Sequence, residues 1–148
     1  MESKMVISMV FRKRINSTFS DLRDLENDFE NFLKVNRIPS DIIYDLKMAI
    51  HEYLLNVMEH GYHWVPNKEI DFEVSIYEEN RSFEVSITIT DSAPKFEISK
   101  DEITKVVNNK SFRGRGLLMI LTFVDDIIYD YSFENGNRVT LKKYFSLN

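Results

Sequence analysis

Hydrophobic and polar positions first alternate along the chain and then take up a helical period. Alternation over residues 4–12 predicts a strand with one apolar face. Over residues 20–36 apolar side chains recur at intervals of three and four, which predicts a helix with Ser20 as its N-cap. A second helix is predicted to begin at Pro39 and to run to about His60. The apolar face of the first helix consists of Leu22, Leu25, Phe29, Phe32 and Leu33.

Strand patterns dominate the second half of the chain. A polar turn at residues 79–81 separates the first two strands, and an Asn-Gly hairpin signal at residues 134–137 separates the last two. Between the two pairs, residues 98–110 are weakly helical, and residues 111–126 are predicted to form a glycine-containing loop that opens a short apolar helix. The four strands are predicted over residues 70–78, 83–90, 127–133 and 138–145.

The predicted order is strand, helix, helix, two strands, helix, two strands. Elements in this order pack most simply with the helices together on one face of the sheet. We therefore expect an α+β fold, a two-layer sandwich with a mixed, mostly antiparallel sheet and helices on one face. A chain of 148 residues is most simply one domain, residues 1–148.

Composition and charge narrow the classes of function. Hydrophobic residues make up 43% of the chain and aromatic residues 13%, which argues against a disordered protein. A net charge of -5 argues against a broad surface for DNA or RNA, and the absence of cysteine excludes disulfides and cysteine-ligated zinc. No apolar run approaches the roughly 18 residues of a membrane span, and the N-terminal apolar stretch is too short for a secretory signal. We expect a cytoplasmic protein that binds neither nucleic acid nor membrane directly.

Residues 51–60, HEYLLNVMEH, hold the densest set of candidate ligands. A zinc-protease motif needs a second histidine four residues after His51, where the chain has Leu55. His60 lies about half a turn around the helix from His51. A histidine-kinase phosphoacceptor needs a helical hairpin, whereas strands follow this helix. Both interpretations fail, which leaves a solvated helix face or a ligand site of another kind.

This second helix is amphipathic. Glu52 and Asn56 lie one turn apart on its polar side, and such a pair can hold hydrated Mg²⁺ while the carboxylate orients an attacking hydroxyl. Met48 and Ala49 are expected to leave an uncharged surface beside Glu52. A solvated face is still the commoner meaning of such a pattern taken alone. The projection places Ile43, Leu46, Ile50, Leu54 and Val57 on one side, and Asp45, Glu52, Asn56, Glu59 and, if the helix persists that far, His63 on the other.

Two later segments carry further candidate chemistry. Asp91 ends an apolar strand, and its carboxylate can accept a hydrogen bond from an exocyclic amine such as that of adenine; Asp beside Pro94 is more commonly a turn former. Gly114 and Gly116 directly precede the predicted helix, where backbone N–H groups can approach phosphate oxygens. Three cations lie close by in this acidic protein: Lys110, Arg113 and Arg115.

Taken in order, these segments resemble a known family, the anti-sigma-factor serine kinases and related switch proteins of the GHKL (Bergerat-type) ATPase superfamily. The family's first box is a glutamate, three residues, an asparagine and a following His-Gly-Tyr, which Glu52, Asn56 and residues 60–62 match in register. The second box, an aspartate with small residues, Pro and Phe, resembles residues 91–96. The third, Gly-x-Gly-Leu at the start of a helix, resembles residues 114–117.

The resemblance implies a Bergerat-type domain that uses ATP and Mg²⁺. By resemblance, Glu52 is the general base for the acceptor hydroxyl, Asn56 helps to coordinate Mg²⁺, and Asp91 binds the adenine amino group. Residues 98–115 correspond to a lid over the nucleotide. The implied partners are a sigma factor, an antagonist protein that is phosphorylated on serine or threonine, and a second copy in a homodimer. The implied nucleotide-binding residues are Asn56, Asp91, Ala93, Lys110, Arg113, Gly114, Arg115, Gly116, Leu117 and Thr140.

The chain departs from the family pattern at two positions. Ala93 stands where the family usually has glycine, and Leu118 stands where a further glycine is common. Because a methyl group at position 93 disfavours positive φ, Ala93 motivates a second hypothesis, a non-catalytic switch that retains only partner binding. A third hypothesis, the detached ATP-binding domain of a histidine kinase, is opposed by the short lid and by the lack of a phosphoacceptor helix pair.

Overall fold

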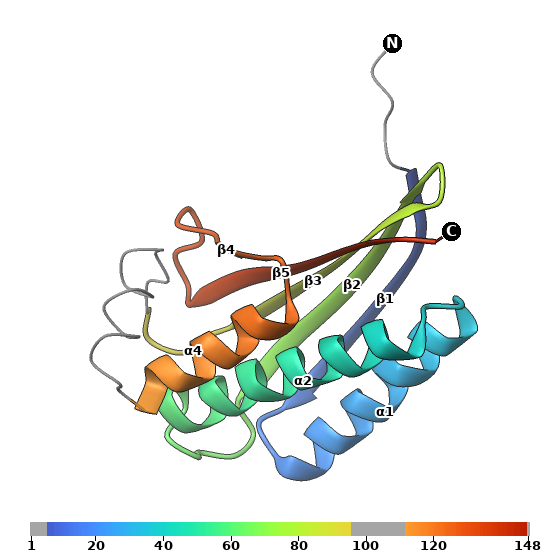
Figure 1. Cartoon of the computed structure of the whole chain (residues 1–148). Helices are drawn as coiled ribbons and strands as arrows, with labels where there is room; N and C mark the ends of the chain where they lie inside the picture. The colour runs from blue at the N-terminus through green and yellow to red at the C-terminus, as the bar shows by residue number, and fades with distance from the viewer. Residues whose placement is uncertain (1–5, 96–111, 148) are drawn as a thin grey trace.

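The computed structural model describes residues 6–95 and 112–147, with side chains for all of these except residues 7, 8 and 112–117. Within these residues, strands and helices follow the predicted order (Figure 1). The strands are β1 Val6–Asn16, β2 Glu69–Glu79, β3 Ser82–Asp91, β4 Asp126–Tyr129 and β5 Asn137–Ser146. The helices are α1 Phe19–Val35, α2 Ser40–Asn56, the π-helical turn η1 Val57–Gly61 and α4 Phe112–Phe123.

The five described strands form one sheet in the order β1-β2-β3-β5-β4. Each of their pairings is antiparallel, so the predicted mixed character is wrong for this sheet. β5 lies between β3 and β4, which brings the C-terminal strand beside the strand that ends at Asp91. The register of this pair places Asp91 opposite Asn137, and Thr88 opposite Thr140.

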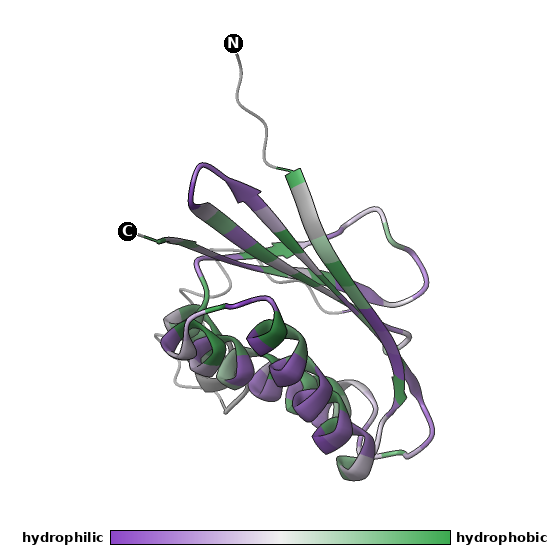
Figure 2. Cartoon of the chain, turned by 90° about the vertical axis from the view of Figure 1, so that its right-hand side faces the viewer, coloured by the Kyte–Doolittle hydropathy of each residue, from purple (hydrophilic) through white to green (hydrophobic). Residues whose placement is uncertain are grey.

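The helices cover one face of the sheet, which confirms the predicted two-layer α+β sandwich (Figure 2). Strand alternation turns Ile70, Phe72 and Val74 of β2 toward the helices, where they are at most 1% exposed. The ring of Phe29 on α1 meets the ring of Phe72 edge to face, with centroids 5.5 Å apart. The core therefore lies between the sheet and the helices, and polar side chains such as Arg12, Asp71 and Glu73 lie on the other face of the sheet.

The first helix begins slightly earlier than predicted. Its N-cap is Thr18 and not Ser20, because the Thr18 hydroxyl accepts a hydrogen bond from the Asp21 N–H at 3.2 Å. The Asp21 carboxylate in turn accepts from the Asn16 N–H at 2.8 Å. These reciprocal bonds satisfy backbone donors at the end of β1 and the start of α1, and so fix the sharp change of direction between them.

The two hairpins differ in how well the sequence predicts them. Asn80 and Arg81 have φ of 47° and 67°, as a tight two-residue turn between β2 and β3 requires. β4 ends at Tyr129, earlier than predicted, because the Asp130 carboxylate accepts hydrogen bonds from the Ser132 N–H and hydroxyl at 3.0 and 2.5 Å. This side-chain turn stops the strand, so a longer loop connects β4 to β5.

Candidate nucleotide site

Three segments meet at one end of the molecule: the end of α2 with η1, the end of β3, and the beginning of α4 (Figure 1). α4 runs antiparallel to α2, since Phe123 near its end contacts Tyr44 near the start of α2, with ring centroids 6.2 Å apart. The beginning of α4 therefore lies beside the end of α2. A helix N-terminus offers free N–H groups and a positive dipole end to an anion.

The Glu52–Asn56 pair lies on the last turns of α2. Both side chains are half-buried, and the apolar residues predicted for the opposite side of the helix are all buried. The Asn56 Nδ2 is buried and has no hydrogen-bond partner within the described residues. Directly after Asn56 the helix widens into η1, and such π-helical turns are rare and frequent at functional sites. The Nδ2 is a hydrogen-bond donor, which an acceptor oxygen of a ligand can satisfy.

The predicted helix projection is wrong about Ala49, and its condition for including His63 is not met. Ala49 is 0% exposed and belongs to the core, so it leaves no uncharged surface beside Glu52. His63 does not extend the polar face, because η1 ends at Gly61 and His63 has a φ of 50°. The Tyr62 N–H instead bonds to the Val57 carbonyl at 2.8 Å, which closes the widened turn. The polar face of this helix therefore ends before His63.

Asp91 lies at the end of β3 on the helix side of the sheet and is only 3% exposed. Its Oδ1 accepts hydrogen bonds from the Asn137 Nδ2 at 3.0 Å and from the Ala93 N–H at 2.9 Å. Its Oδ2 is buried and has no hydrogen-bond partner within the described residues. Burial raises the pKa of Asp91, and the hydrogen bonds from Asn137 and Ala93 oppose that rise. One carboxylate oxygen is thus held in place while the other remains open as an acceptor.

Asn137 is a site residue that the sequence analysis missed. It is 0% exposed, its Nδ2 donates to Asp91 and also to the Pro94 carbonyl at 3.1 Å, and its Oδ1 accepts from the Tyr129 hydroxyl at 2.8 Å. The Nδ2 donates to oxygen acceptors and the Oδ1 accepts from a hydroxyl. Exchanging the two ends of the amide would place an acceptor against an acceptor, so the amide has a single satisfactory orientation. The signal in the sequence was weak, since Asn137 only completes the predicted hairpin turn.

Gly136 allows that turn to approach Asp91. A Cβ at this position would lie 1.9 Å from the Asp91 carbonyl oxygen, and the φ of Gly136 is 145°, which L side chains rarely adopt. The glycine of the predicted Asn-Gly signal therefore has a second role. It lets the loop before β5 close over the backbone of Asp91 and brings Asn137 within reach of the carboxylate.

Ala93 is buried beside Asp91, and its N–H donates to that carboxylate. The described residues with positive φ do not include Ala93, so the methyl group carries no backbone penalty there. The expected strain at this departure from the family pattern is therefore absent. The methyl group instead packs toward η1, where a Cβ on Gly61 would lie 2.9 Å away.

The third box differs from the prediction in where its helix begins. α4 starts at Phe112, so Gly114 and Gly116 lie within its first turns and not in a loop before it. Because glycine has a low helix propensity, these two residues favour a helix that begins after Gly116. The packing of α4 on α2 outweighs this preference. The side chains of Arg113, Arg115 and Leu117, and the whole of Lys110, lie outside the described residues.

Thr140 is the one described candidate that the structure places away from this site. It lies opposite Thr88 across β5 and β3, and their hydroxyl oxygens are 3.0 Å apart. Since strand side chains alternate and Asp91 and Asn137 face the helices, Thr140 faces the open side of the sheet. Thr140 therefore lies on the opposite face of the sheet from Asp91, and this position does not support the prediction that it contacts nucleotide.

A groove of about 510 Å³ also lies on this open face, apart from Asp91. Ion pairs cross it, with Arg12 Nε 2.8 Å from a Glu73 carboxylate oxygen and Arg14 Nε 2.7 Å from an Asp71 carboxylate oxygen. It is a salt-bridged polar surface on the far side of the sheet from the candidate site. Among the described helices, none combines the length and apolar character needed to cross a membrane.

Comparison with known proteins identifies the family of the chain. A family model for the histidine kinase-like ATPase domain matches residues 15–143, which include all three segments of the site. An anti-sigma F factor of Clostridium botulinum is 33% identical over 114 residues, which cover 72% of this chain and 74% of that protein. A serine-protein kinase RsbW of Listeria innocua is 30% identical over 109 residues, which cover 72% of this chain and 68% of that protein. The chain belongs to the histidine kinase-like ATPase domain family.

Proposed function

We propose that this protein binds ATP with Mg²⁺ and acts as an anti-sigma factor and a serine/threonine protein kinase. The observation that carries the proposal is the open Oδ2 of buried Asp91 at the same end of the molecule as the half-buried Glu52–Asn56 pair. The names of the relatives, anti-sigma F factor and serine-protein kinase, support the choice of partners. The partners proposed here are a sigma factor and an antagonist protein that carries the acceptor hydroxyl.

Each described site residue has a role in nucleotide binding under this proposal. The Asp91 Oδ2 accepts a hydrogen bond from the exocyclic amine of adenine, whereas guanine presents a carbonyl oxygen at that position and is repelled. Asn56 supplies a side-chain oxygen for Mg²⁺, which characteristically keeps several waters and takes few protein ligands. The N-terminus of α4 faces the phosphates with its N–H groups and positive dipole end. Mg²⁺ neutralises charge on the phosphates when bound.

Phosphoryl transfer needs positioning and one base. The Glu52 carboxylate takes the proton of a serine or threonine hydroxyl on the antagonist. The hydroxyl oxygen attacks the γ-phosphorus, the bond from that phosphorus to the β–γ bridging oxygen breaks, and ADP leaves with the released electron pair. Within the described residues Glu52 forms no hydrogen bond or ion pair, and its side chain is half-buried on the last turns of α2.

The proposal includes a homodimer. β1 is an edge strand of the described sheet, and its side chains Val6, Met9 and Val10 are 67%, 46% and 41% exposed. A long edge strand with exposed apolar residues is a common place for pairing with another chain. Sedimentation of the wild type and of Val10→Glu tests this point, with a concentration-dependent dimer expected for the wild type and a weaker one for the variant.

Calorimetric titration with ADP and a non-hydrolysable ATP analogue, with and without Mg²⁺, tests the nucleotide site. We expect magnesium-dependent binding of the analogue, which Asn56→Ala weakens, and binding of both nucleotides that Asp91→Ala removes. A wild-type protein that binds neither nucleotide at millimolar concentration would contradict the kinase proposal and favour a non-catalytic switch. The backbone conformation of Ala93 supports the kinase over that switch.

The chemical stability of the phosphorylated product separates the kinase from a detached histidine-kinase domain. Phosphoserine and phosphothreonine are phosphate esters and survive acid, whereas the phosphoramidate of phosphohistidine is hydrolysed by acid. We expect acid-stable label on the antagonist protein after incubation with labelled ATP. Acid-labile label on a partner would instead support the histidine-kinase interpretation.

A further inference from the structure

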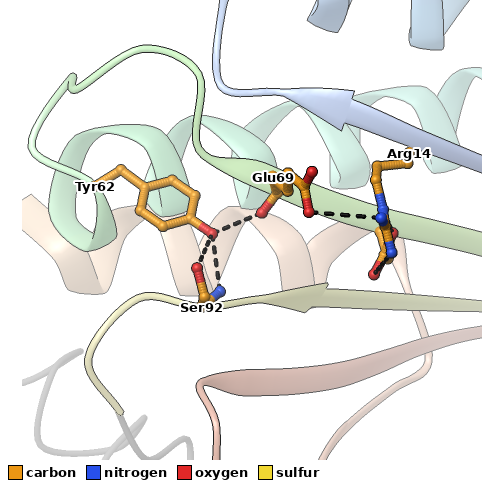
Figure 3. A network of polar contacts seen from close by, with 5 residues as sticks. Arg14, Tyr62, Glu69 and Ser92 are labelled. Carbon is orange, nitrogen blue, oxygen red and sulfur yellow. Dashed lines mark hydrogen bonds and ion pairs between the residues drawn. The ribbon is translucent and has the colours of Figure 1, made fainter.

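Tyr62 joins three segments of the chain at the candidate site. It follows η1 directly, and its side chain is 6% exposed. Its hydroxyl donates to the Glu69 carbonyl at the start of β2 at 2.7 Å and accepts from the Ser92 N–H at 2.8 Å (Figure 3). The Ser92 hydroxyl lies 3.2 Å from the same oxygen. A single phenol oxygen therefore connects η1, β2 and the residue after Asp91.

These contacts use the full hydrogen-bonding capacity of the Tyr62 hydroxyl. A phenol has one donor and two acceptor positions. The donor goes to the Glu69 carbonyl, so the two Ser92 groups occupy the acceptor positions. The Glu69 carboxylate is in turn paired with Arg14 at 3.6 Å, which ties β2 to β1 at the same place (Figure 3). This junction of Tyr62, Glu69 and Ser92 is thus connected to both β1 and β2.

A second contact supports the same junction. Gly61, the residue before Tyr62, lies so close to Ala93 that a Cβ on Gly61 would be 2.9 Å from the Ala93 Cβ. Ser92 and Ala93 are the two residues that follow Asp91 in the chain. Contacts from Gly61 and Tyr62 therefore hold the segment that carries Asp91 against the turn that ends α2.

We propose that Tyr62 is a positioning residue for the candidate nucleotide site, which fastens residues 91–93 to η1 and so fixes the separation between Asp91 and Asn56. The inference rests on the proposed function, because Asp91 and Asn56 are there assigned to opposite ends of one nucleotide. A nucleotide has a limited span between its base and its phosphates, so both ends bind well only when this separation is held. Tyr62 itself touches no nucleotide in this role.

The test compares Tyr62→Phe with the wild type and with Tyr77→Phe. Tyr77 lies on β2, and its hydroxyl forms no hydrogen bond with the described residues, so it controls for the loss of a phenol oxygen. Binding of ADP and of inorganic tripolyphosphate is measured by calorimetry below the unfolding temperature of each variant. Hydrogen exchange of the Ser92 and Ala93 amides is measured in the ligand-free protein.

We expect Tyr62→Phe to weaken ADP binding about tenfold, which corresponds to about 1.4 kcal/mol, and tripolyphosphate binding by less than twofold. The Ser92 amide should exchange at least tenfold faster, while Tyr77→Phe leaves all three quantities unchanged. A role in folding alone would lower the unfolding temperature and leave the ADP affinity of the folded protein intact.

Two results would overturn the inference in distinguishable ways. Wild-type ADP affinity and wild-type Ser92 exchange in Tyr62→Phe, together with loss of ADP binding in Asp91→Ala, would remove the positioning role and leave the proposed function standing. Absence of ADP binding in the wild type itself would remove both.

Discussion

A methyl group on Gly61 would lie 2.9 Å from the Cβ of Ala93, closer than real Cβ atoms approach another atom. Ala93 is 3% exposed and is held in place by the hydrogen bond from its N–H to Asp91. The glycine on η1 and the alanine after β3 are therefore a complementary pair. The alanine that departs from the family pattern fills space that a residue with a side chain at position 61 would need.

We expect Gly61→Ala to destabilise the protein by about 1–3 kcal/mol, the usual cost of overpacking. Ala93→Gly removes the opposing methyl group, so the double variant should be more stable than Gly61→Ala alone. Urea unfolding, followed by fluorescence of the single tryptophan Trp64, measures both values. If the effects of the two substitutions were additive, Gly61 and Ala93 would not be energetically coupled. A Gly61→Ala variant that is more stable than the wild type, by the helix-propensity benefit of about 1 kcal/mol, would also contradict the close contact.

Asn137→Ala should destabilise the protein by about 2–3 kcal/mol, because it leaves the buried Tyr129 hydroxyl and the Asp91 Oδ1 without their side-chain partner. ADP affinity should fall as well, since Asp91 keeps the hydrogen bond from the Ala93 N–H but loses the one from Asn137 that helps to fix its orientation. Chemical denaturation and calorimetry measure the two effects. Arg138→Ala is the matched control on the next residue: its ion pair with Asp130 is half-exposed, and we expect a change within about 0.5–1 kcal/mol. An equal effect of the two substitutions would contradict the assigned role of Asn137.

The raised pKa of Asp91 predicts an unusual dependence of stability on pH. Burial raises its pKa above the ordinary value of about 3.9, so its ionisation opposes folding at neutral pH. This cost is relieved as pH falls through the raised pKa and is absent below the unfolded value. The stability of the wild type relative to Asp91→Asn, which carries no charge at this position, should therefore rise as pH falls from 7 toward 4.

The same variant should lose about ten- to a hundredfold in ADP affinity, because a charged acceptor for the adenine amine is replaced by a neutral amide. Denaturation between pH 4 and 8 and calorimetry at pH 7 measure the two effects. A stability difference that stays constant with pH would show that Asp91 ionises as easily in the folded protein as in the unfolded one.

Glu52→Gln should lower the rate of phosphoryl transfer to the antagonist by about a hundredfold or more while leaving ADP affinity within twofold, since a general base contributes to transfer and not to nucleotide binding. Single-turnover transfer with labelled ATP and calorimetry make the two measurements. Glu59→Gln removes a carboxylate on η1 and is the matched control, with wild-type transfer expected. Full transfer activity in Glu52→Gln would remove Glu52 from the catalytic role.

Thr140→Val should leave ADP affinity unchanged, because Thr140 faces the open side of the sheet. Stability should fall by about 0.5–1.5 kcal/mol through loss of the hydrogen bond to Thr88. Calorimetry and urea unfolding check the two expectations. A large loss of ADP affinity with little loss of stability would place Thr140 in the nucleotide site after all.

The sequence by itself determined the elements of this fold, because periodicity is a local property. Alternation in β2 and β3 and the buried face of α2 from Ile43 to Val57 follow directly from the order of apolar residues. The i, i+4 spacing of Glu52 and Asn56 likewise needs only the helical repeat. The resemblance to known motifs added Asp91, whose position at the end of a strand is also local.

Tertiary structure alone decided which distant residues complete the site. The register of β3 with β5 brings Asn137 to Asp91 and turns Thr140 to the far face, and a shift of one residue would exchange those faces. The close approach of Gly61 to Ala93 and the bonds of Tyr62 to Glu69 and Ser92 join segments far apart in the chain. Such contacts depend on how the layers pack, which no local period encodes.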